Sequence, residues 1–265
     1  FALPPAIHIL FILFVASLLF LICLIPLSLG FIIPVSILLN FVIKGYSIIN
    51  FIEIFQITLS SISLAFISSS FIMLLSLLMI IVGAYKSNNF QKILIFFASS
   101  GYAFPGTILA VGIVVFVGWL NDLIYFRMSY AVGGFIILLF AYSIRFLAVG
   151  NGAITSGISR IHPNLLDASR TMGVSFFKSI RKIILPLLYT NLLVGGILVF
   201  VDILKELPIT LLLRPFNFET LATYVYQYAS DEMLEESAFA ALIIVIAGLG
   251  PVIFLNRTIT KSIKN

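Results

Sequence analysis

Long apolar stretches with few or no charged residues are the feature of this sequence that most limits how the chain can fold. A helix needs about 20 apolar residues to cross the roughly 30 Å hydrocarbon core of a bilayer. Six stretches approach or exceed this length, near residues 6–29, 54–84, 94–120, 130–150, 187–205 and 236–256. Only 9% of the 265 residues are charged, whereas soluble domains average about 25%. The sequence predicts an all-α, polytopic membrane protein with about six transmembrane helices and excludes a water-soluble globule.

A shorter apolar piece at residues 31–43 follows the first stretch. Pro34 interrupts this piece, and it is too short to cross a bilayer. We therefore expect an interfacial or partly inserted helix after the first span.

Basic residues are distributed unevenly between the segments that connect the six stretches. With the N-terminus in the cytoplasm, the inner side carries most of the 15 basic residues: Lys86, Lys92, Arg145, Arg160, Arg170, Lys178, Arg181, Lys182, Arg257, Lys261 and Lys264. Asp167 is the only acidic residue on that side. An excess of Lys and Arg marks cytoplasmic loops. We therefore predict that the N- and C-termini of residues 1–265 both lie in the cytoplasm. The net charge of +5 then results from topology and does not indicate nucleic-acid binding.

Two connecting segments are long enough to do more than join helices. The inner one covers residues 151–186, and the outer one covers residues 206–235. No low-complexity tract or domain-sized linker appears, so we expect residues 1–265 to form a single transmembrane domain. The one cysteine, Cys23, excludes an intrachain disulfide and a cysteine-based metal site.

The inner segment contains a pattern with fixed spacing. Asp167-Ala168-Ser169 is followed by three residues, then Gly173, then nine residues, and then Ile183-Ile184-Leu185-Pro186. Apolar residues recur across it at mostly four-residue steps, as on one side of a helix, and glycine can adopt φ > 0 in a turn. The pattern predicts a cytoplasmic helix, a turn at Gly173 and a second amphipathic helix that leads into the span opened by Pro186.

This pattern resembles the EAA loop of bacterial ABC importer permeases, in which E-A-A, three residues, G, nine residues and I-x-L-P follow one another. Asp167 stands in place of the glutamate, and Ser169 stands in place of the second alanine. The resemblance implies a MetI-like permease in the inner membrane, with a coupling helix that docks onto a separate ATPase. The residues it assigns to coupling are Asp167, Ala168, Ser169, Gly173, Ile183, Leu185 and Pro186. The alternative for this segment is an ordinary basic amphipathic helix at the lipid headgroups.

Two further regions resemble ferric-iron ABC permeases. Residues 205–216 and 219–232 look like the corresponding stretch of those proteins, and residues 24–34 look like the start of their second half. Such permeases are commonly fusions of two six-span halves, each with its own EAA loop. Because the chain begins with Phe1 and not with Met, we expect it to be a piece of a longer polypeptide that carries the second half.

The resemblance implies transport of ferric iron from a periplasmic binding protein into the cytoplasm. The implied partners are an ABC ATPase dimer, a second permease half, the binding protein and membrane lipid, without nucleic acid. Permeases for thiamine, phosphonates and polyamines share much of this architecture, so another small solute is an alternative cargo. The alternative mechanism is a secondary transporter driven by an ion gradient, although the internal repeat and midplane charge typical of such folds are not visible in the sequence.

Charged residues at the outer end of the fifth stretch are candidates for the translocation path. Asp202, Lys205 and Glu206 are spaced i, i+3 and i+4 and share one side of a helix, and Pro208 follows. This spacing allows an Asp202–Lys205 ion pair with Glu206 facing the path. Carboxylates suit a hard cation, so we expect Glu206 to contact the cargo transiently at most, without a resident metal site. The alternative is a satisfied ion pair that closes the helix end.

Two features of the third and fourth stretches each allow two interpretations. Arg145 lies near the expected inner end of its span, where it can reach the headgroups as an anchor or serve in gating. Pro105 and the small residues around it allow close helix packing or a local break beside the path.

The sequence contains no catalytic motif. The patterns G-x-x-x-x-G-K-[ST] and H-E-x-x-H are absent, and no serine or cysteine nucleophile is accompanied by a suitable base. We therefore expect a transport subunit and not an enzyme, with no cofactor bound by this chain. ATP and Mg²⁺ are expected on the partner ATPase.

Overall fold

A computed structural model of the chain describes residues 5–46, 48–85, 89–124, 130–162 and 164–264. Over these ranges it consists of helices and turns and contains no β-strand. The elements are, in chain order, α1 (Pro5–Leu27), the π-helical η1 (Ser28–Ile32), α2 (Ile33–Lys44), α3 (Phe51–Tyr85), α4 (Asn89–Ser99), the 3₁₀-helical η2 (Ser100–Ala103), α5 (Gly106–Ile124), α6 (Tyr130–Ile158), α7 (Asn164–Thr171), α8 (Phe176–Ser179), the π-helical η3 (Ile180–Ile184), α9 (Leu185–Leu204), α10 (Pro208–Leu213), α11 (Leu221–Ser230) and α12 (Leu234–Lys264). The predicted all-α class is confirmed.

Five helices in the described part of the chain are long and apolar enough to cross a membrane: Leu13–Lys44, Phe51–Gly83, Gly133–Ile158, Phe176–Leu204 and Leu234–Arg257. A further candidate is a broken helix, in which Asn89–Ala103 and Gly106–Asp122 meet at 115°. The count is therefore five, or six if the bent pair is one span, and the predicted polytopic architecture is confirmed.

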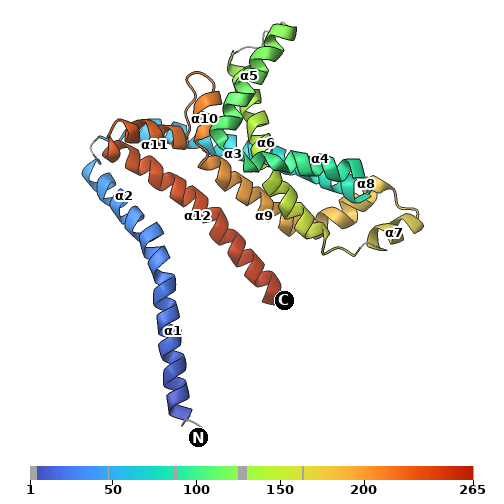
Figure 1. The fold of residues 1–265 in the computed structure, drawn as a ribbon, viewed down its shortest axis with the longest axis horizontal. Coiled ribbons are helices and arrows are strands. Elements are labelled where there is room, and N and C mark those ends of the chain that lie inside the picture. Colours follow the sequence, from blue (N-terminus) through green and yellow to red (C-terminus); the bar gives the residue numbers. More distant parts are fainter. Residues whose placement is uncertain (1–4, 47, 86–88, 125–129, 163, 265) are drawn as a thin grey trace.

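The first apolar stretch and residues 31–43 form one continuous helix. The expected helix over this piece is present, but it is not separate from the first span, because α1, η1 and α2 follow one another without a break. In η1 the Ile33 N–H donates to the Ser28 carbonyl, five residues back and not four. This wider turn leaves Pro34 at the start of α2, where a missing N–H costs little. α1 runs away from the other helices (Figure 1).

The third predicted span is broken in its middle. Phe104 has an extended backbone, with φ −82° and ψ 138°, and it separates η2 from α5. A residue that precedes proline is sterically disfavoured in the helical conformation, so Pro105 ends the first helix. The predicted stretch over residues 94–120 is therefore bent, and the local break that Pro105 allowed is present.

The centre of the molecule is a bundle of α3, α6 and α9 (Figure 1). Glycines let these helices approach closely. A Cβ atom built on Gly150 would lie 2.4 Å from Ser76 Oγ of α3, and one on Gly195 would lie 2.8 Å from Ala153 Cβ of α6. Small residues at such contacts let helix backbones pack closely. The bundle therefore holds α6 and α9 directly against each other, with these buried side chains among those that fill its core: Ile72, Leu138, Tyr142, Ile154, Leu188 and Val199.

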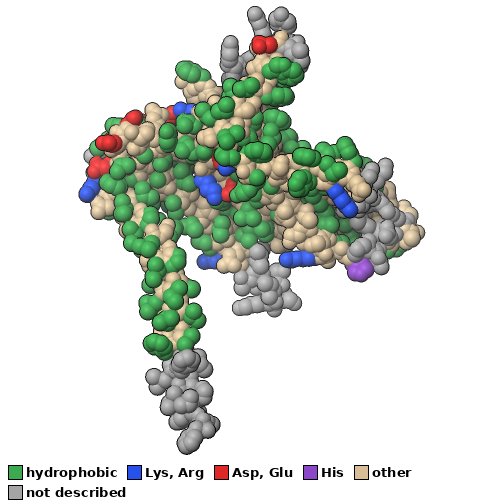
Figure 2. All heavy atoms as spheres, in the orientation of Figure 1, with side chains coloured by type: hydrophobic (Ala, Val, Ile, Leu, Met, Phe, Trp, Pro, Cys, Tyr) green, Lys and Arg blue, Asp and Glu red, His purple; other side chains and the backbone are tan. Residues whose placement is uncertain are grey.

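The two long connecting segments lie at opposite ends of the molecule. α7 and α8 lie at one end, and α11 lies at the other (Figure 1). The Leu221 N–H donates to Ser61 Oγ of α3 at 2.7 Å, which fixes the start of α11 to the bundle. Acidic side chains gather over the α11 end (Figure 2).

Candidate functional site

The inner connecting segment forms two short helices joined by a turn at Gly173, where φ is +72°. The Met172 N–H donates to the Ala168 carbonyl at 3.2 Å. The Val174 N–H donates to the Ser169 carbonyl at 3.0 Å. In this arrangement a left-handed residue lets the last carbonyls of a helix find partners. A Cβ atom on Gly173 would meet nothing within 4 Å, so the backbone conformation, and not crowding, requires glycine here.

A buried hydrogen bond joins the two helices of this segment. Ser169 of α7 and Ser179 of α8 are both buried, and their hydroxyl oxygens lie 2.9 Å apart. Ser169 is one of the two residues at which the sequence departs from the E-A-A pattern. In this chain the extra hydroxyl therefore ties α7 to α8.

The other predicted coupling residues lie along the segment and do not form one cluster. Ala168 is exposed on α7. Ile183 and Leu185 are half-buried in the helix that leads into α9, and Pro186 is exposed in its first turn. Asp167 lies in α7, but its side chain is outside the described part of the structure.

α8, η3 and α9 form one helix with a wider turn before Pro186. The Leu185 N–H donates to the Ile180 carbonyl, five residues back. Proline lacks an N–H, and its ring crowds the carbonyl four residues earlier, so the wider turn lets the helix continue. η1 has the same spacing, since it ends two residues before Pro34. π turns inside α-helices are frequent at functional sites.

Two large apolar side chains of the inner segment point away from the protein. Phe177 is 82% exposed and Met172 is 73% exposed. Large apolar side chains exposed on a segment outside the apolar stretches are candidates for contacts with another protein. The sequence analysis did not single out Phe177. The sequence feature that could have indicated it is the adjacent pair Phe176 and Phe177. Neighbouring residues of a helix cannot both face its buried side, and here only Phe176 does.

The charged residues after α9 take part in two separate ion pairs. Lys205 Nζ lies 2.9 Å from Asp202 Oδ1, and the Lys205 side chain is 63% exposed, so the pair that the spacing allows is present. Glu206 Oε2 lies 3.4 Å from Nε of Arg145 on α6, and the Glu206 side chain is only 8% exposed. Glu206 is therefore buried against α6 and does not stand open beside Lys205. Pro208 opens α10 just beyond it.

Glu206 also organises the start of α10. Its Oε1 accepts a hydrogen bond from the Ile209 N–H at 3.3 Å, and its carbonyl accepts one from Thr210 Oγ1 at 2.7 Å. The Tyr142 hydroxyl of α6 lies 2.5 Å from the same Thr210 oxygen. Burial raises the pKa of the Glu206 carboxyl, although the nearby Arg145 guanidinium acts in the opposite direction.

Arg145 joins α6 to the bend between η2 and α5. Its Nη1 donates to the Phe104 carbonyl at 3.1 Å. A Cβ atom on Gly106 would lie 2.9 Å from Glu206 Oε1 and 3.0 Å from Arg145 Nη1, so the bend lies directly against the ion pair. α6 continues to Ile158, which puts Arg145 near its middle, and the interpretation as a headgroup anchor was wrong. The sequence feature that could have predicted a buried partner for Arg145 is its position inside an otherwise uncharged span, where an arginine is normally paired.

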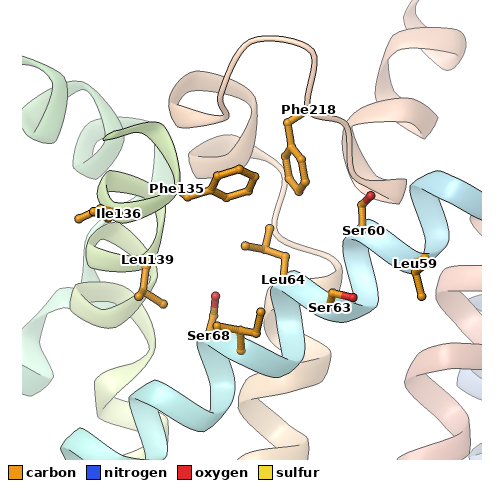
Figure 3. Close-up of a pocket in the computed structure, with 10 residues that line it drawn as sticks. Leu59, Ser60, Ser63, Leu64, Ser68, Phe135, Ile136, Leu139 and Phe218 are labelled. Atoms are coloured by element: carbon orange, nitrogen blue, oxygen red, sulfur yellow. The ribbon is translucent and has the colours of Figure 1, made fainter. Parts of the chain in front are cut away.

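An apolar groove lies between α3, α6 and the segment before α11 (Figure 3). It has a volume of about 490 Å³ and is lined by Leu59, Ser60, Ser63, Leu64, Ile67, Ser68, Phe135, Ile136, Leu139 and Phe218. Among the described residues, the buried Ser68 hydroxyl has no hydrogen-bond partner. Sequence analysis did not find the groove, because its residues are spread over three separate segments. No group of three His, Cys, Asp or Glu residues in the described ranges is placed to hold a metal ion.

Comparison with known proteins gives a family and a relative. Residues 77–265 match the family described as binding-protein-dependent transport system inner membrane component. The Fe(3+)-transport system permease protein FbpB 2 of Haemophilus influenzae is 25% identical over 157 residues. That match covers 59% of this chain and 29% of the relative, so the chain matches less than a third of that protein's length.

Two solved structures share the fold. A bacterial ABC transporter involved in the import of the acidic polysaccharide alginate matches 92% of this chain and 94% of its own, with a TM-score of 0.68 and 16% identity. An inward-facing structure of the MetNI methionine ABC transporter matches 78% of this chain and 95% of its own, with a TM-score of 0.57 and 15% identity. The expected permease fold is therefore confirmed. The chain is a multi-pass membrane protein that belongs to the binding-protein-dependent transport system inner membrane component family, the permeases of ABC importers.

Proposed function

We propose that this chain moves ferric iron from a periplasmic binding protein into the cytoplasm and is driven by a separate ATPase. Family membership supplies the coarser part, an ABC importer permease. The observation that carries the ATPase assignment is the inner segment, where the Gly173 turn presents the exposed side chain of Met172 and α8 presents that of Phe177. We assign this segment as the surface that docks onto the ATPase.

The position of the inner segment supports a mechanical role. α6 leads into this segment and α9 follows it. The two helices are in close contact, since a Cβ atom built on Gly157 of α6 would lie only 2.6 Å from Leu188 Cδ2 of α9. An ATPase that closes on ATP and Mg²⁺ would displace both helices together. Docking must differ in free energy between nucleotide states, because a surface bound equally well in both states shifts no population.

The proposal includes a second permease half, in the same or a fused chain, and surrounding lipid. The acidic side chains near α11 (Figure 2) form the end that would receive the binding protein. Arg181 and Lys182 belong to the opposite, inner segment. This asymmetry of charge supports an orientation in the inner membrane with the N- and C-termini of residues 1–265 in the cytoplasm.

Ferric iron is the proposed cargo because the Haemophilus influenzae relative is named as an Fe(3+)-transport permease. Carboxylate oxygens suit such a hard cation. The Asp202 side chain is 20% exposed and the Glu206 side chain is 8% exposed. In the proposed path Asp202 is therefore the carboxylate that cargo reaches first, and Glu206 becomes available only when its contact with Arg145 opens.

Transport into proteoliposomes tests the proposal. The permease is reconstituted with its ATPase and iron-loaded binding protein, and uptake of radioactive ferric iron is measured. We expect uptake to require ATP and binding protein, to stop with vanadate and to continue with an uncoupler. Uptake that stops with the uncoupler and continues with vanadate would contradict the ATP-driven mechanism. ATP-driven uptake of thiamine, a phosphonate or a polyamine in place of iron would contradict the proposed cargo alone.

A further inference from the structure

The Arg145–Glu206 pair joins the two helices that flank the inner segment at a point distant from that segment. Arg145 projects from α6, and Glu206 follows α9 directly. α6 and α9 also contact each other closer to the inner segment, at Gly157 and Leu188. A displacement of the inner segment therefore reaches both members of the pair through two helices in direct contact.

Two further elements meet at the same pair. The Phe104 carbonyl, at the 115° bend before α5, accepts from Arg145 Nη1 at 3.1 Å. The Ile209 N–H, in the first turn of α10, donates to Glu206 Oε1 at 3.3 Å. The pair thus connects α6 and α9 on one side to α5 and α10 on the other.

The chemistry of arginine suits this position. A guanidinium spreads its charge over a planar fork of N–H groups, so Nη1 donates to the Phe104 carbonyl while Nε forms an ion pair with Glu206 at 3.4 Å without a hydrogen bond. A lysine carries its donors on one nitrogen atom and does not have this fork. The Arg145 side chain is 21% exposed and the Glu206 side chain only 8%, so removal of the Arg145 charge leaves the buried carboxylate without compensation.

We propose that Arg145 is a positioning residue for transport, which holds the bend before α5 against the α9–α10 turn. Through this contact, movement of α6 and α9 at the ATPase end is passed to α5 and α10. The inference rests on the proposed function, because it assumes that an ATPase drives the inner segment. It adds a mechanical connection that does not depend on which cargo is carried.

The structure offers two independent ways to disturb the pair. Arg145→Gln and Glu206→Gln each remove one charge, and Arg145→Lys keeps the charge without the fork. Gly106→Ala changes no charge, but its Cβ would lie 2.9 Å from Glu206 Oε1. Gly112→Ala is the matched control, because it lies in the same helix with nothing within 4 Å of its Cβ position.

The measurement is the ratio of binding-protein-stimulated to basal ATPase activity, with iron-loaded binding protein, at matched membrane abundance. We expect Arg145→Gln, Arg145→Lys, Glu206→Gln and Gly106→Ala to lower this ratio at least fivefold while the ATPase still copurifies. Gly112→Ala should keep the ratio of the unmodified protein. The double variant Arg145→Gln with Glu206→Gln leaves no unpaired buried charge, so it should reach the membrane abundance of the unmodified protein and still lack stimulation.

Two results would overturn the proposal. Normal stimulation in Arg145→Gln or Gly106→Ala would show that the contact carries no movement. Normal stimulation in the double variant would assign the pair to stability alone. If the unmodified transporter is itself not stimulated by the binding protein, the proposed function fails, and this outcome is distinct from a loss confined to the variants.

Discussion

Gly173 is the residue whose backbone conformation most restricts replacement, since its φ is +72° with open space around the Cβ position. A β-branched side chain in this conformation costs about 1–3 kcal/mol, whereas asparagine visits it more readily. We expect Gly173→Val to insert normally but to lose uptake, and Gly173→Asn to keep most of it. Uptake assays at matched abundance check this. Equal uptake by the two variants would show that the turn conformation is not what matters.

Phe177 is 82% exposed and lies on the inner segment that we propose docks onto the ATPase. Aromatic anchors at interfaces contribute about 2 kcal/mol or more, and about 1.4 kcal/mol is a tenfold change in Kd. We expect Phe177→Ser to weaken ATPase binding at least tenfold, as measured by titration of the purified permease. Phe216→Ser is the matched control, because Phe216 is 93% exposed but lies in the other long connecting segment. A Kd unchanged by Phe177→Ser would remove this side chain from the docking surface.

At the scale of helices, two wider turns occur at the same distance before a proline. η1 ends at Ile32 before Pro34, and η3 ends at Ile184 before Pro186. In each case the proline removes a donor and crowds the preceding turn, so the helix continues by a bond to the fifth residue back. Only η3 lies between α8 and α9, so only its turn sets how α7 and α8 are oriented relative to α9.

Replacing Pro186 tests the role of η3. Pro186→Ala restores an N–H and permits a regular α-helical turn, which changes the rotation of α8 about the helix axis by up to about 100°, one residue's share of a turn. We expect normal insertion and a loss of binding-protein-stimulated ATPase activity. Pro34→Ala makes the same chemical change in η1 and should leave stimulation intact. Identical behaviour of the two variants would argue against an orienting role for η3.

At the scale of the whole molecule, the inner segment and α11 lie at opposite ends (Figure 1). Cysteine labelling in a Cys23→Ser background measures which side of the membrane each end faces. We expect a cysteine at position 175 to react only from the cytoplasm and one at position 216 only from the outside, since both positions are exposed. Labelling of position 216 from the cytoplasm would contradict the proposed orientation.

Much of this architecture was predictable because it depends on local properties of the chain. Apolar stretches of sufficient length locate the spans, and Gly173 after an amphipathic helix predicts a turn that the structure contains. The i, i+3 spacing of Asp202 and Lys205 was sufficient for their ion pair, which lies within a single helical turn. The wider turn that carries the first helix through Pro34 was missed, because a proline predicts a disturbance without specifying how the backbone absorbs it.

The contacts that join distant parts of the chain depended on tertiary packing. Pro105 allowed a bend, but its 115° angle follows from how α4 and α5 pack against α6 and α10. The partner of Glu206 is Arg145 on α6, whereas the spacing within its own helix predicted only that Glu206 faces the path. Hydrophobicity and backbone preference are properties of short segments, so they place helices along the chain. The rotation of each helix toward its neighbours is set by side-chain packing across the whole bundle, and that rotation brings Arg145, Glu206 and the Phe104 carbonyl together.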